Sequence, residues 1–481
     1  MTATATVVGS GPNGLAAAIT LARAGVDVTV LEAASTPGGG MRSADVTGPG
    51  VVSDVCSAAH PLAVASPFFT GANLGAHGLE FAWPEVDLAH PLDDGTAGVL
   101  YRDIDATAAG LGVDGPMWKR TFGPFAANFA DLVSDALDSP VHLPRHPVLF
   151  GLFGANAALP ASVSWRRWRT PQARALFTGV AAHAMSRLDT PMSSSVGMLL
   201  TASAHARGWP VAVGGSGAIA DAMVAELESL GGRIETGRTV QSIDELGDSD
   251  VVMLDVSPRN ALSILGRNRV PRRQRRAYGK YRHGMAAFKV DFVIAGDVPW
   301  TNEDCRRAGT VHLGGTAEEV AATEKMSAGG AMPNKPFVLV GQQYLADPSR
   351  SSGTLNPLWS YAHVPQGFRG DATEAIIAQI ERFAPGFRDI IVSRNSMSTG
   401  DLENYNANYI GGDILGGHSG VTQLLARPVL SPDPYHAGIP GTYLCSASTP
   451  PGAGVHGMCG ANAAARALSE LAGGRVRKTW R

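Results

Sequence analysis

The stretch Val7-Val-Gly9-Ser-Gly11-Pro12-Asn13-Gly14 decides the fold. It overlaps the end of the β-branched run Thr4–Val8, and the apolar segment 15–24 that follows it has the composition of a helix. Val26–Leu31 is then predicted as a second strand, which ends at Glu32. A G-x-G-x-x-G motif between a strand and a helix, with an acid after the next strand, is typical of dinucleotide-binding βαβ units. The sequence therefore predicts an α/β protein with a Rossmann-like domain.

The three glycines of the motif have different predicted roles. Gly9 permits the tight turn, Gly11 lets a pyrophosphate approach the backbone, and Gly14 allows the helix to pack on the strand. Pro12 and Asn13 begin the helix, whose free N–H groups and partial positive charge attract phosphate. An ordinary Gly-rich turn is the alternative interpretation of this motif.

The residues after the second strand narrow the choice of dinucleotide. The carboxylate of Glu32, which Ala33 follows, is expected to accept hydrogen bonds from ribose hydroxyls and to repel a 2′-phosphate, so it favours FAD or NAD. The glycine-rich segment Gly38-Gly39-Gly40-Met41-Arg42 comes soon after, and a plain surface loop is its alternative interpretation. The chain contains one complete fingerprint, so a dedicated nicotinamide domain is not expected.

The composition is that of a globular protein with no preference for nucleic acid. Hydrophobic residues make up 44% of the 481 residues and charged residues 17%, which allows a sizeable core. A net charge of -3 provides no basic excess for a phosphate backbone. The four cysteines show no C-x-x-C spacing, so neither a metal site nor a dithiol redox centre is predicted. No signal-peptide pattern is recognised, and we expect a cytoplasmic protein.

Residues 146–169 allow two interpretations. Their apolar run, 148–163, is interrupted by Asn156 and Pro160 and is too short for a membrane span. Basic and aromatic residues flank the run, in Arg145-His-Pro147 and in Trp165-Arg-Arg-Trp-Arg169. This arrangement is typical of peripheral contact with a membrane surface. A buried helix with Arg and Trp at the domain rim is the alternative.

The middle of the chain predicts helices and a second sheet. Residues 103–204 have a helical pattern broken at prolines, whereas 233–236 and 238–240 are predicted as a strand pair near the adenine that ends at Val240. Residues 251–256 form a further apolar strand. Between 266 and 429, strands alternate with a helix at 372–383, which indicates an α+β arrangement of a mixed sheet with helical cover.

The C-terminal part repeats the strand, glycine-loop and helix order. A short strand at 441–445 precedes the glycine-rich loop 448–460, which contains His456, Gly457 and Met458, and a strong helix follows at 461–471. Such a loop can present backbone N–H groups to the pyrophosphate or the N1–C2=O edge of a flavin.

These motifs together resemble the FAD-dependent phytoene desaturase-like and amine-oxidase superfamily, especially the branch of pyridine nucleotide-disulphide oxidoreductase domain-containing protein 2. The matching blocks are 8–14, Glu32-Ala33, 37–40, His60-Pro61, 309–315, 381–387 and 444–460. The resemblance extends over essentially the whole chain. Because C-x-x-C is absent from the sequence, disulphide reduction is not expected.

The resemblance implies non-covalent FAD held between two discontinuous domains. It assigns 1–75, 205–265 and 430–481 to the FAD-binding domain and 76–204 and 266–429 to the substrate-binding domain. It also implies that Gly39, Gly40, Met41 and Arg42 approach the pyrophosphate and the flavin side.

Two residues are catalytic candidates through the resemblance. Amine-oxidase relatives hold a water at flavin N5 with a Lys on a substrate-domain strand, and the block that contains Lys289 is similar to theirs. A rim Lys with a solvated amine is the alternative. His456 stands where carotene desaturases have Pro, and it either transfers protons beside the flavin or holds the loop. Gly457-Met458-Cys459 lacks the aromatic cage wall of amine oxidases.

The resemblance favours one function over three others. We expect desaturation of an apolar isoprenoid or lipid-like small molecule, in which a hydride passes to flavin N5 and O2 or a quinone accepts the electrons. An amine oxidase, a redox-neutral flavin-dependent isomerase and a non-catalytic FAD-stabilised interaction protein are the alternatives. Neither the exact substrate nor the oligomeric state follows from the sequence.

Overall fold

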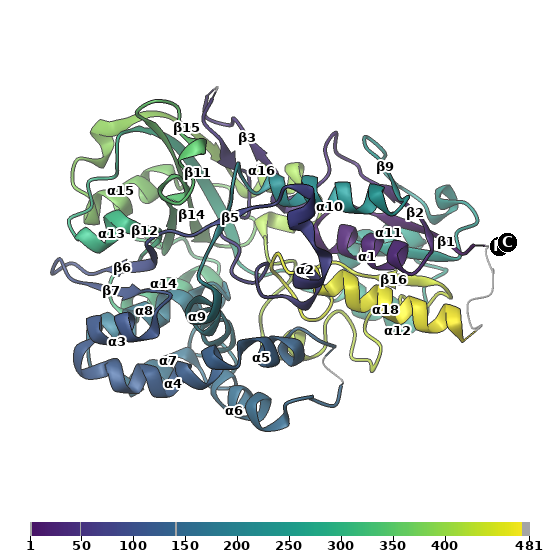
Figure 1. Ribbon diagram of the computed structural model, residues 1–481, viewed down its shortest axis with the longest axis horizontal. Coiled ribbons are helices and arrows are strands. Elements are labelled where there is room, and N and C mark those ends of the chain that lie inside the picture. The colour runs from purple at the N-terminus through teal and green to yellow at the C-terminus, as the bar shows by residue number, and fades with distance from the viewer. Residues whose placement is uncertain (1, 49, 140–141, 474–481) are drawn as a thin grey trace.

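The computed structural model describes residues 2–48, 50–139 and 142–473. They form two main sheets, each with helical cover, side by side along the longest axis of the molecule (Figure 1), and two further pairs of short strands. The N-terminal strand and the C-terminal helix belong to the same half.

The first sheet is the predicted Rossmann-like sheet. Its five parallel strands have the order β16-β10-β1-β2-β9. They are β1 (Thr4–Val8), β2 (Asp27–Leu31), β9 (Arg233–Glu235), β10 (Val251–Leu254) and β16 (Thr442–Leu444). One apolar cluster packs one face of the sheet under α1 (Pro12–Arg23), α10 (Gly217–Ser229) and α18 (Met458–Ala472). Another packs the opposite face under α11 (Pro258–Leu265) and α12 (Arg272–Gly279).

The second sheet is mixed, as predicted. Its order is β15-β11-β14-β13-β12-β6-β7, and its strand pairs are antiparallel except for β12 with β6. The strands are β6 (Val86–Pro91), β7 (Ala97–Leu100), β11 (Ala286–Ala295), β12 (Ala308–Leu313), β13 (Val338–Gly341), β14 (Leu355–Val364) and β15 (Ile391–Met397).

Helices cover both faces of this sheet. The predicted helical region contains α3 (Ile104–Gly110), α4 (Gly115–Ala127), α5 (Phe129–Ala136), α6 (Pro147–Ala157), α7 (Ala161–Ser164), α8 (Pro171–Ala182) and α9 (Ser195–Arg207). Several of these pack one face of the sheet, together with α14 (Ala317–Ala328). The opposite face packs against α13 (Glu303–Arg307) and α15 (Thr373–Phe383).

Shorter elements join the halves. They are η1 (Gly39–Met41), β3 (Ser43–Ala44) with β4 (Ser53–Asp54), α2 (Pro67–Ala72), β5 (Phe81–Ala82) with β8 (Val211–Ala212), α16 (Thr399–Tyr405), η9 (Ile410–Gly412) and α17 (Val421–Leu425). Each main sheet takes its strands from the segments assigned to it in the sequence, although the domain boundaries themselves stay a prediction.

The predicted strand at 238–240 is wrong. The chain turns at Gly237, whose φ is 67°. The N–H groups of Gly237 and Arg238 then donate to the carbonyls of Ala34 and Glu32, both at 2.8 Å. These bonds hold the segment beside the end of β2 instead of extending a ladder, so β9 is the one strand here.

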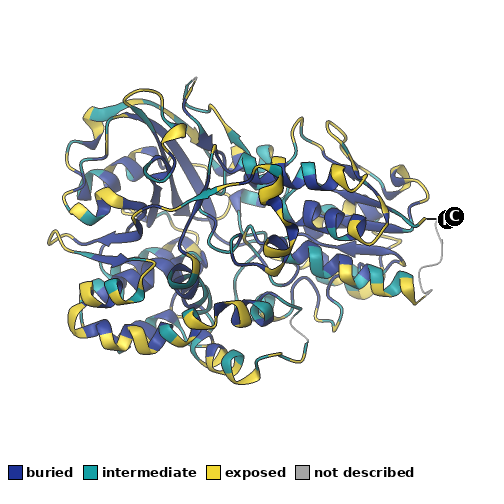
Figure 2. Cartoon of the chain, in the orientation of Figure 1, coloured by how far each residue is buried: buried dark blue, intermediate teal, exposed yellow. Residues whose placement is uncertain are grey.

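The buried-helix interpretation of 148–163 is also wrong for α6. Val148 is 84% exposed and Leu152 49%, whereas Phe153 and Ala157 are buried. Figure 2 shows much of this helix in the colour of exposed residues. The tryptophans expected at the rim, Trp165 and Trp168, are buried instead. Among the described residues, no single helix is long and apolar enough to cross a membrane. Only α6 and the segment 161–167 taken together reach that length and composition, and they are bent by 95° relative to each other.

Candidate dinucleotide and substrate site

The glycine motif forms a tight turn at the carboxyl edge of the first sheet. Gly9 has φ 98°, and Gly11 caps α1 in an extended conformation with Pro12 next to it. A Cβ on Gly14 would overlap the carbonyl oxygen of Gly9, so glycine is required where α1 meets β1. The first turn of α1 contains no acidic residue of its own. The N–H of Gly14 donates to the Asp255 carboxylate at 2.9 Å, so the other free N–H groups of this turn are the ones suited to an anion.

A second glycine segment closes against the first. A Cβ on Gly39, in η1, would lie 2.9 Å from Cα of Gly11. The side-chain oxygen of Asn13 is buried and has no hydrogen-bond partner in the described chain. The hydroxyl of Tyr405 donates to the carbonyl of Gly39 at 2.9 Å, so α16 lies over this segment. Met41 is fully buried in the core of this half, so only its backbone faces the turn.

Glu32 lies at the end of β2, where the sequence places the ribose ligand. One carboxylate oxygen accepts from the N–H and hydroxyl of Ser10, at 2.9 and 2.5 Å. The other accepts from the N–H of Ala34 at 2.8 Å and from Arg42 at 3.2 Å. A ribose hydroxyl would share these oxygens with the chain. Arg42 is thereby tied to Glu32 and to the carbonyl of Thr36, at 2.7 Å.

We expect Glu32→Ala to raise the Kd for FAD about 10- to 100-fold, because charge-assisted hydrogen bonds to the ribose are lost. Fluorescence titration with FAD measures the change. Glu235→Ala is the matched control, because Glu235 is an exposed acid on the neighbouring β9. An unchanged Kd in the Glu32 variant would remove this residue from the ribose site.

The C-terminal loop reaches the same turn. Gly457, with φ 68°, caps α18, which again has no side-chain cap and no acid in its first turn. A Cβ on Gly460 would overlap the carbonyl oxygen of Asn13, so the first turns of α18 and α1 touch (Figure 1). Met458 packs between the two halves, against the core clusters of both.

Both ring nitrogens of His456 are used by the loop itself. Nδ1 accepts from the N–H of Met458 at 3.0 Å, and Nε2 lies 3.2 Å from the carbonyl oxygen of Gly452. Burial lowers the pKa of His456 to about 4, so the ring is neutral at pH 7. This geometry is that of the loop-holding alternative.

Lys289 lies inside the protein on β11. Its side chain is 3% exposed, so the rim alternative is wrong. It forms an ion pair with Asp291 on the same face of the strand, and its ammonium group lies 5.8 Å from the ring centroid of Trp359. Asp291 was not predicted as a site residue, although spacing by two on a strand places two side chains on one face. Burial raises the pKa of Asp291, and its second oxygen has no hydrogen-bond partner in the described chain.

Cys56 and Tyr409 connect Lys289 with the glycine segments. Burial raises the pKa of the Cys56 thiol, and the nearby Tyr409 hydroxyl and Lys289 ammonium group oppose this rise. A Cβ on Gly40 would overlap the Tyr409 hydroxyl and lie 3.8 Å from Cβ of Cys56. Cys56 and Tyr409 thus lie between the predicted residues Gly40 and Lys289.

Asp255 was missed as well. It follows β10, and its Oδ2 accepts from the N–H of Gly14 at 2.9 Å. Burial raises the pKa of Asp255 to about 7. The position of Asp255 directly after a predicted strand could have indicated this role, since the carboxyl ends of adjacent parallel strands meet at one edge of a sheet.

The face of the second sheet that carries Lys289 is aromatic and polar farther along. Ring contacts of 5.1 to 5.6 Å lead from Trp359 through Tyr361 and His363 on β14 to Phe337. Phe337 contacts His312 on β12 at 5.5 Å, and His183 lies 4.9 Å beyond it. Burial lowers the pKa of His183 to about 3, so its imidazole is neutral at pH 7.

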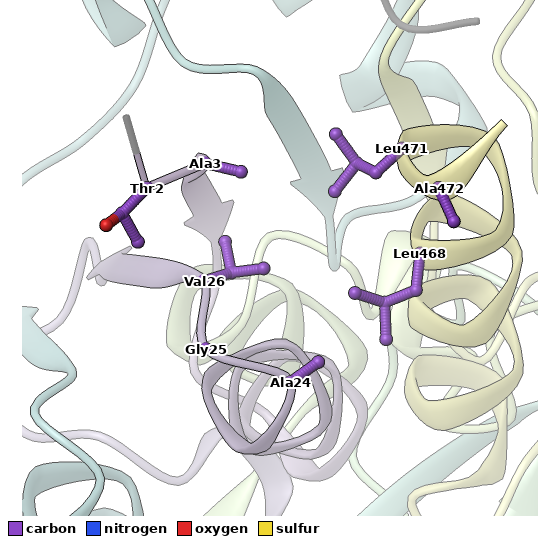
Figure 3. A pocket seen from close by; sticks show the side chains of 8 residues that line it. All are labelled: Thr2, Ala3, Ala24, Gly25, Val26, Leu468, Leu471 and Ala472. Atoms are coloured by element: carbon purple, nitrogen blue, oxygen red, sulfur yellow. The ribbon is translucent and has the colours of Figure 1, made fainter. Parts of the chain in front are cut away.

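Two predicted residues and one surface hollow lie apart from this site. Val240 packs in the apolar cluster on the face opposite α1, and Ala33 is exposed. The hollow in Figure 3 is lined by Thr2, Ala3, Ala24, Gly25, Val26, Leu468, Leu471 and Ala472. It lies at the amino ends of β1 and β2, opposite the carboxyl edge where α/β sheets bind ligands.

Curated relatives match parts of the chain. The NAD(P)-binding Rossmann-like domain family matches residues 7–67. Pyridine nucleotide-disulfide oxidoreductase domain-containing protein 2 of Mus musculus is 40% identical over 86 residues, 18% of this chain and 15% of that protein. Hydroxyneurosporene desaturase of Cereibacter sphaeroides is 30% identical over 259 residues, 49% of this chain and 50% of that protein. The matches thus span at most half the length of these relatives.

Solved structures share the whole fold. Putrescine oxidase bound to putrescine has a TM-score of 0.61 at 16% identity, over 98% of this chain and 99% of that one. An oxidoreductase from Methanosarcina mazei has a TM-score of 0.61 at 14% identity, over 97% and 100%. Fold and motifs define a two-part protein with a Rossmann-like, dinucleotide-binding half. The sequence matches confirm, over the parts they cover, the resemblance to phytoene desaturase-like proteins that the motifs predicted, and the solved structures show the shared fold.

Proposed function

We propose that the protein is an oxidoreductase that binds FAD non-covalently. The main support is that three glycine-rich segments meet at the first turns of two adjacent helices. These segments lie around Gly11, Gly39 and Gly457. The unpartnered oxygen of Asn13 and the contact between Gly11 and Gly39 fit the backbone of a dinucleotide. Bound flavin supplies an acceptor for a hydride.

The purified chain tests this proposal directly. It should be yellow, and acid precipitation should release intact FAD into the supernatant, where chromatography identifies it. A colourless protein that cannot be reconstituted with FAD would refute the proposal. A flavin that stays with the precipitate would refute non-covalent binding alone.

We further propose that the substrate is an apolar, isoprenoid or lipid-like molecule that becomes desaturated. The relationship to a hydroxyneurosporene desaturase over half of each chain supports this. Trp359 and Tyr361 line the sheet beside Lys289 and offer flat apolar surface. In this proposal Lys289 and Asp291 hold the water or the proton that leaves the substrate, and His456 holds the loop. O2 or a quinone would accept the electrons.

Amine oxidation is the second candidate. The same aromatic pair lies beside Lys289, and aromatic walls favour an amine through cation–π attraction. The shared fold with putrescine oxidase is compatible with it. Release of H2O2 with amines, and none with polyenes, would decide for this candidate.

We also propose that α6 and the turn after it contact an anionic membrane surface. Val148, Leu152 and Val163 are exposed, and 163 is followed by Arg166 and Arg169, both exposed. Exposed apolar side chains beside basic ones suit a bilayer with acidic lipids. An apolar substrate would then enter from the lipid.

The double variant Val148→Asp/Leu152→Asp should lower the binding of the protein to phosphatidylglycerol vesicles about 10- to 100-fold, because two apolar side chains lose their burial. Vesicle co-sedimentation measures this. Val392→Asp is the control, since Val392 is 56% exposed on β15, away from α6. Wild-type protein that stays in the supernatant would contradict membrane contact.

A further inference from the structure

Arg427 is a buried guanidinium that has no anionic partner in the described part of the chain. It lies between α17 and β16 and is 4% exposed. Within residues 2–48, 50–139 and 142–473 it forms no ion pair, and its one hydrogen bond runs from Nη2 to the hydroxyl of Tyr281 at 3.3 Å. Its Nε is buried without a partner. A buried charge is costly unless something compensates it, so this side chain indicates an absent anion.

The guanidinium faces the glycine loop that precedes α18. A Cβ on Gly452 would overlap Nη1, so the missing side chain makes room for Arg427. The Gly452 carbonyl oxygen accepts from the Cys459 thiol at 3.2 Å. The charge of Arg427 also reaches that thiol, which lies in the first turn of α18.

Two helix N-termini converge beside this charge. The first turn of α18 contains no acid and has no side-chain cap, and the same holds for α1. The two turns touch where Gly460 meets Asn13. The Asp255 carboxylate lies at the first turn of α1, where its Oδ2 accepts from the N–H of Gly14 at 2.9 Å. Burial raises the pKa of the Cys459 thiol, the charge of Arg427 opposes this rise, and the charge of Asp255 adds to it. Two helix dipoles and one guanidinium thus face the same region, and Asp255 is the acid that lies with them.

We propose that Arg427 binds an anionic oxygen of the bound dinucleotide, on its pyrophosphate or at the pyrimidine edge of the reduced flavin ring. The proposal rests on the proposed FAD. In this proposal the positive charge of Arg427 balances the negative charge of the bound cofactor. A guanidinium suits this role because it donates in a fixed, planar fork and stays charged at every working pH.

Titration of the full chain with FAD and, separately, with ADP tests the proposal. Arg427→Met should raise the Kd for FAD about 10- to 100-fold. Equal losses for FAD and ADP assign the contact to the pyrophosphate. A loss for FAD alone, with a more negative flavin midpoint potential, assigns it to the ring. Unchanged Kd values for both, with an unchanged potential, would overturn the proposal.

Thermal melting without ligand separates binding from structure. Removal of an unpaired buried charge should leave Tm unchanged or raise it, whereas a lower Tm with unchanged Kd values marks a structural residue and overturns the proposal. Arg466→Met is the control, because Arg466 on α18 is paired with Asp433 at 2.7 Å and should not alter either Kd. If Arg427→Met does not fold, Arg427→Lys replaces it, and wild-type affinity of that variant for both ligands would overturn the proposal. A wild-type chain that binds neither ligand would instead refute the proposed function.

Discussion

Gly460→Ala should lower the free energy of unfolding by about 3 kcal/mol and abolish FAD binding. The added Cβ would overlap the carbonyl oxygen of Asn13 and lie 2.9 Å from the backbone nitrogen of Ala17. Both are backbone atoms, so α1 and α18 must separate, and overpacking of this kind costs about 1–3 kcal/mol or more. Because α1 carries the phosphate-binding turn, the cofactor site moves with it.

Urea denaturation and FAD titration measure the two effects. Gly151→Ala is the matched control, since Gly151 also lies within a helix but its added Cβ would meet no atom within 4 Å. We expect this control to gain up to about 1 kcal/mol from helix propensity and to bind FAD normally. Equal stability of Gly460→Ala and wild type would contradict the close contact of the helices.

Lys289→Met should slow the reduction of bound flavin by substrate about 10²- to 10⁴-fold, while the FAD content stays that of wild type. This is the range that a positioned proton-transfer group contributes. The ammonium group is buried beside Trp359 and paired with Asp291, on the side that Tyr409 and Cys56 connect to the glycine segments. Stopped-flow bleaching of the flavin is the measurement, and a change below about threefold would return Lys289 to a structural role.

Asp291 supplies the control for that experiment. Removal of one member of a buried pair leaves the other uncompensated and costs about 3–5 kcal/mol, whereas removal of both is often neutral. Lys289→Met/Asp291→Leu should therefore regain most of the stability that Lys289→Met loses. If the double variant is stable but still reduces its flavin slowly, the rate effect is chemical and not a consequence of misfolding.

His456→Ala should weaken FAD binding, whereas Lys289→Met should slow flavin reduction. The ring of His456 bridges the N–H of Met458 and the carbonyl of Gly452, so its loss loosens the loop at the N-terminus of α18. We expect weaker FAD binding, seen in titration, and a bleaching rate at saturating FAD within threefold of wild type. Slower bleaching with full FAD content would instead support the proton-transfer role of His456.

The local pattern of the sequence determined the Rossmann half. Strand, glycine turn, helix and acid are neighbours in the chain, and each depends on short-range rules of φ, helix capping and β-branching, so 4–32 is predicted almost residue by residue. The anion-binding design of 441–471 follows for the same reason. The turn at Gly237 shows where local rules fail, because the bonds to Ala34 and Glu32 that replace the ladder join distant parts of the chain.

Only the tertiary structure decided which buried groups are partners and which have none. The pairing of Lys289 with Asp291 follows from strand register, but its approach to Cys56 and Gly40 requires the two halves to be packed together. The exposure of α6 depends on which helix faces the core already fills, and an apolar run does not contain that information. Arg427 is one more basic residue in the sequence; its burial without an acid appears only when Gly452, Tyr281 and two helix N-termini are placed around it. Composition and periodicity fix which residues form elements, whereas the balance of charge inside a protein is set by contacts across the whole chain.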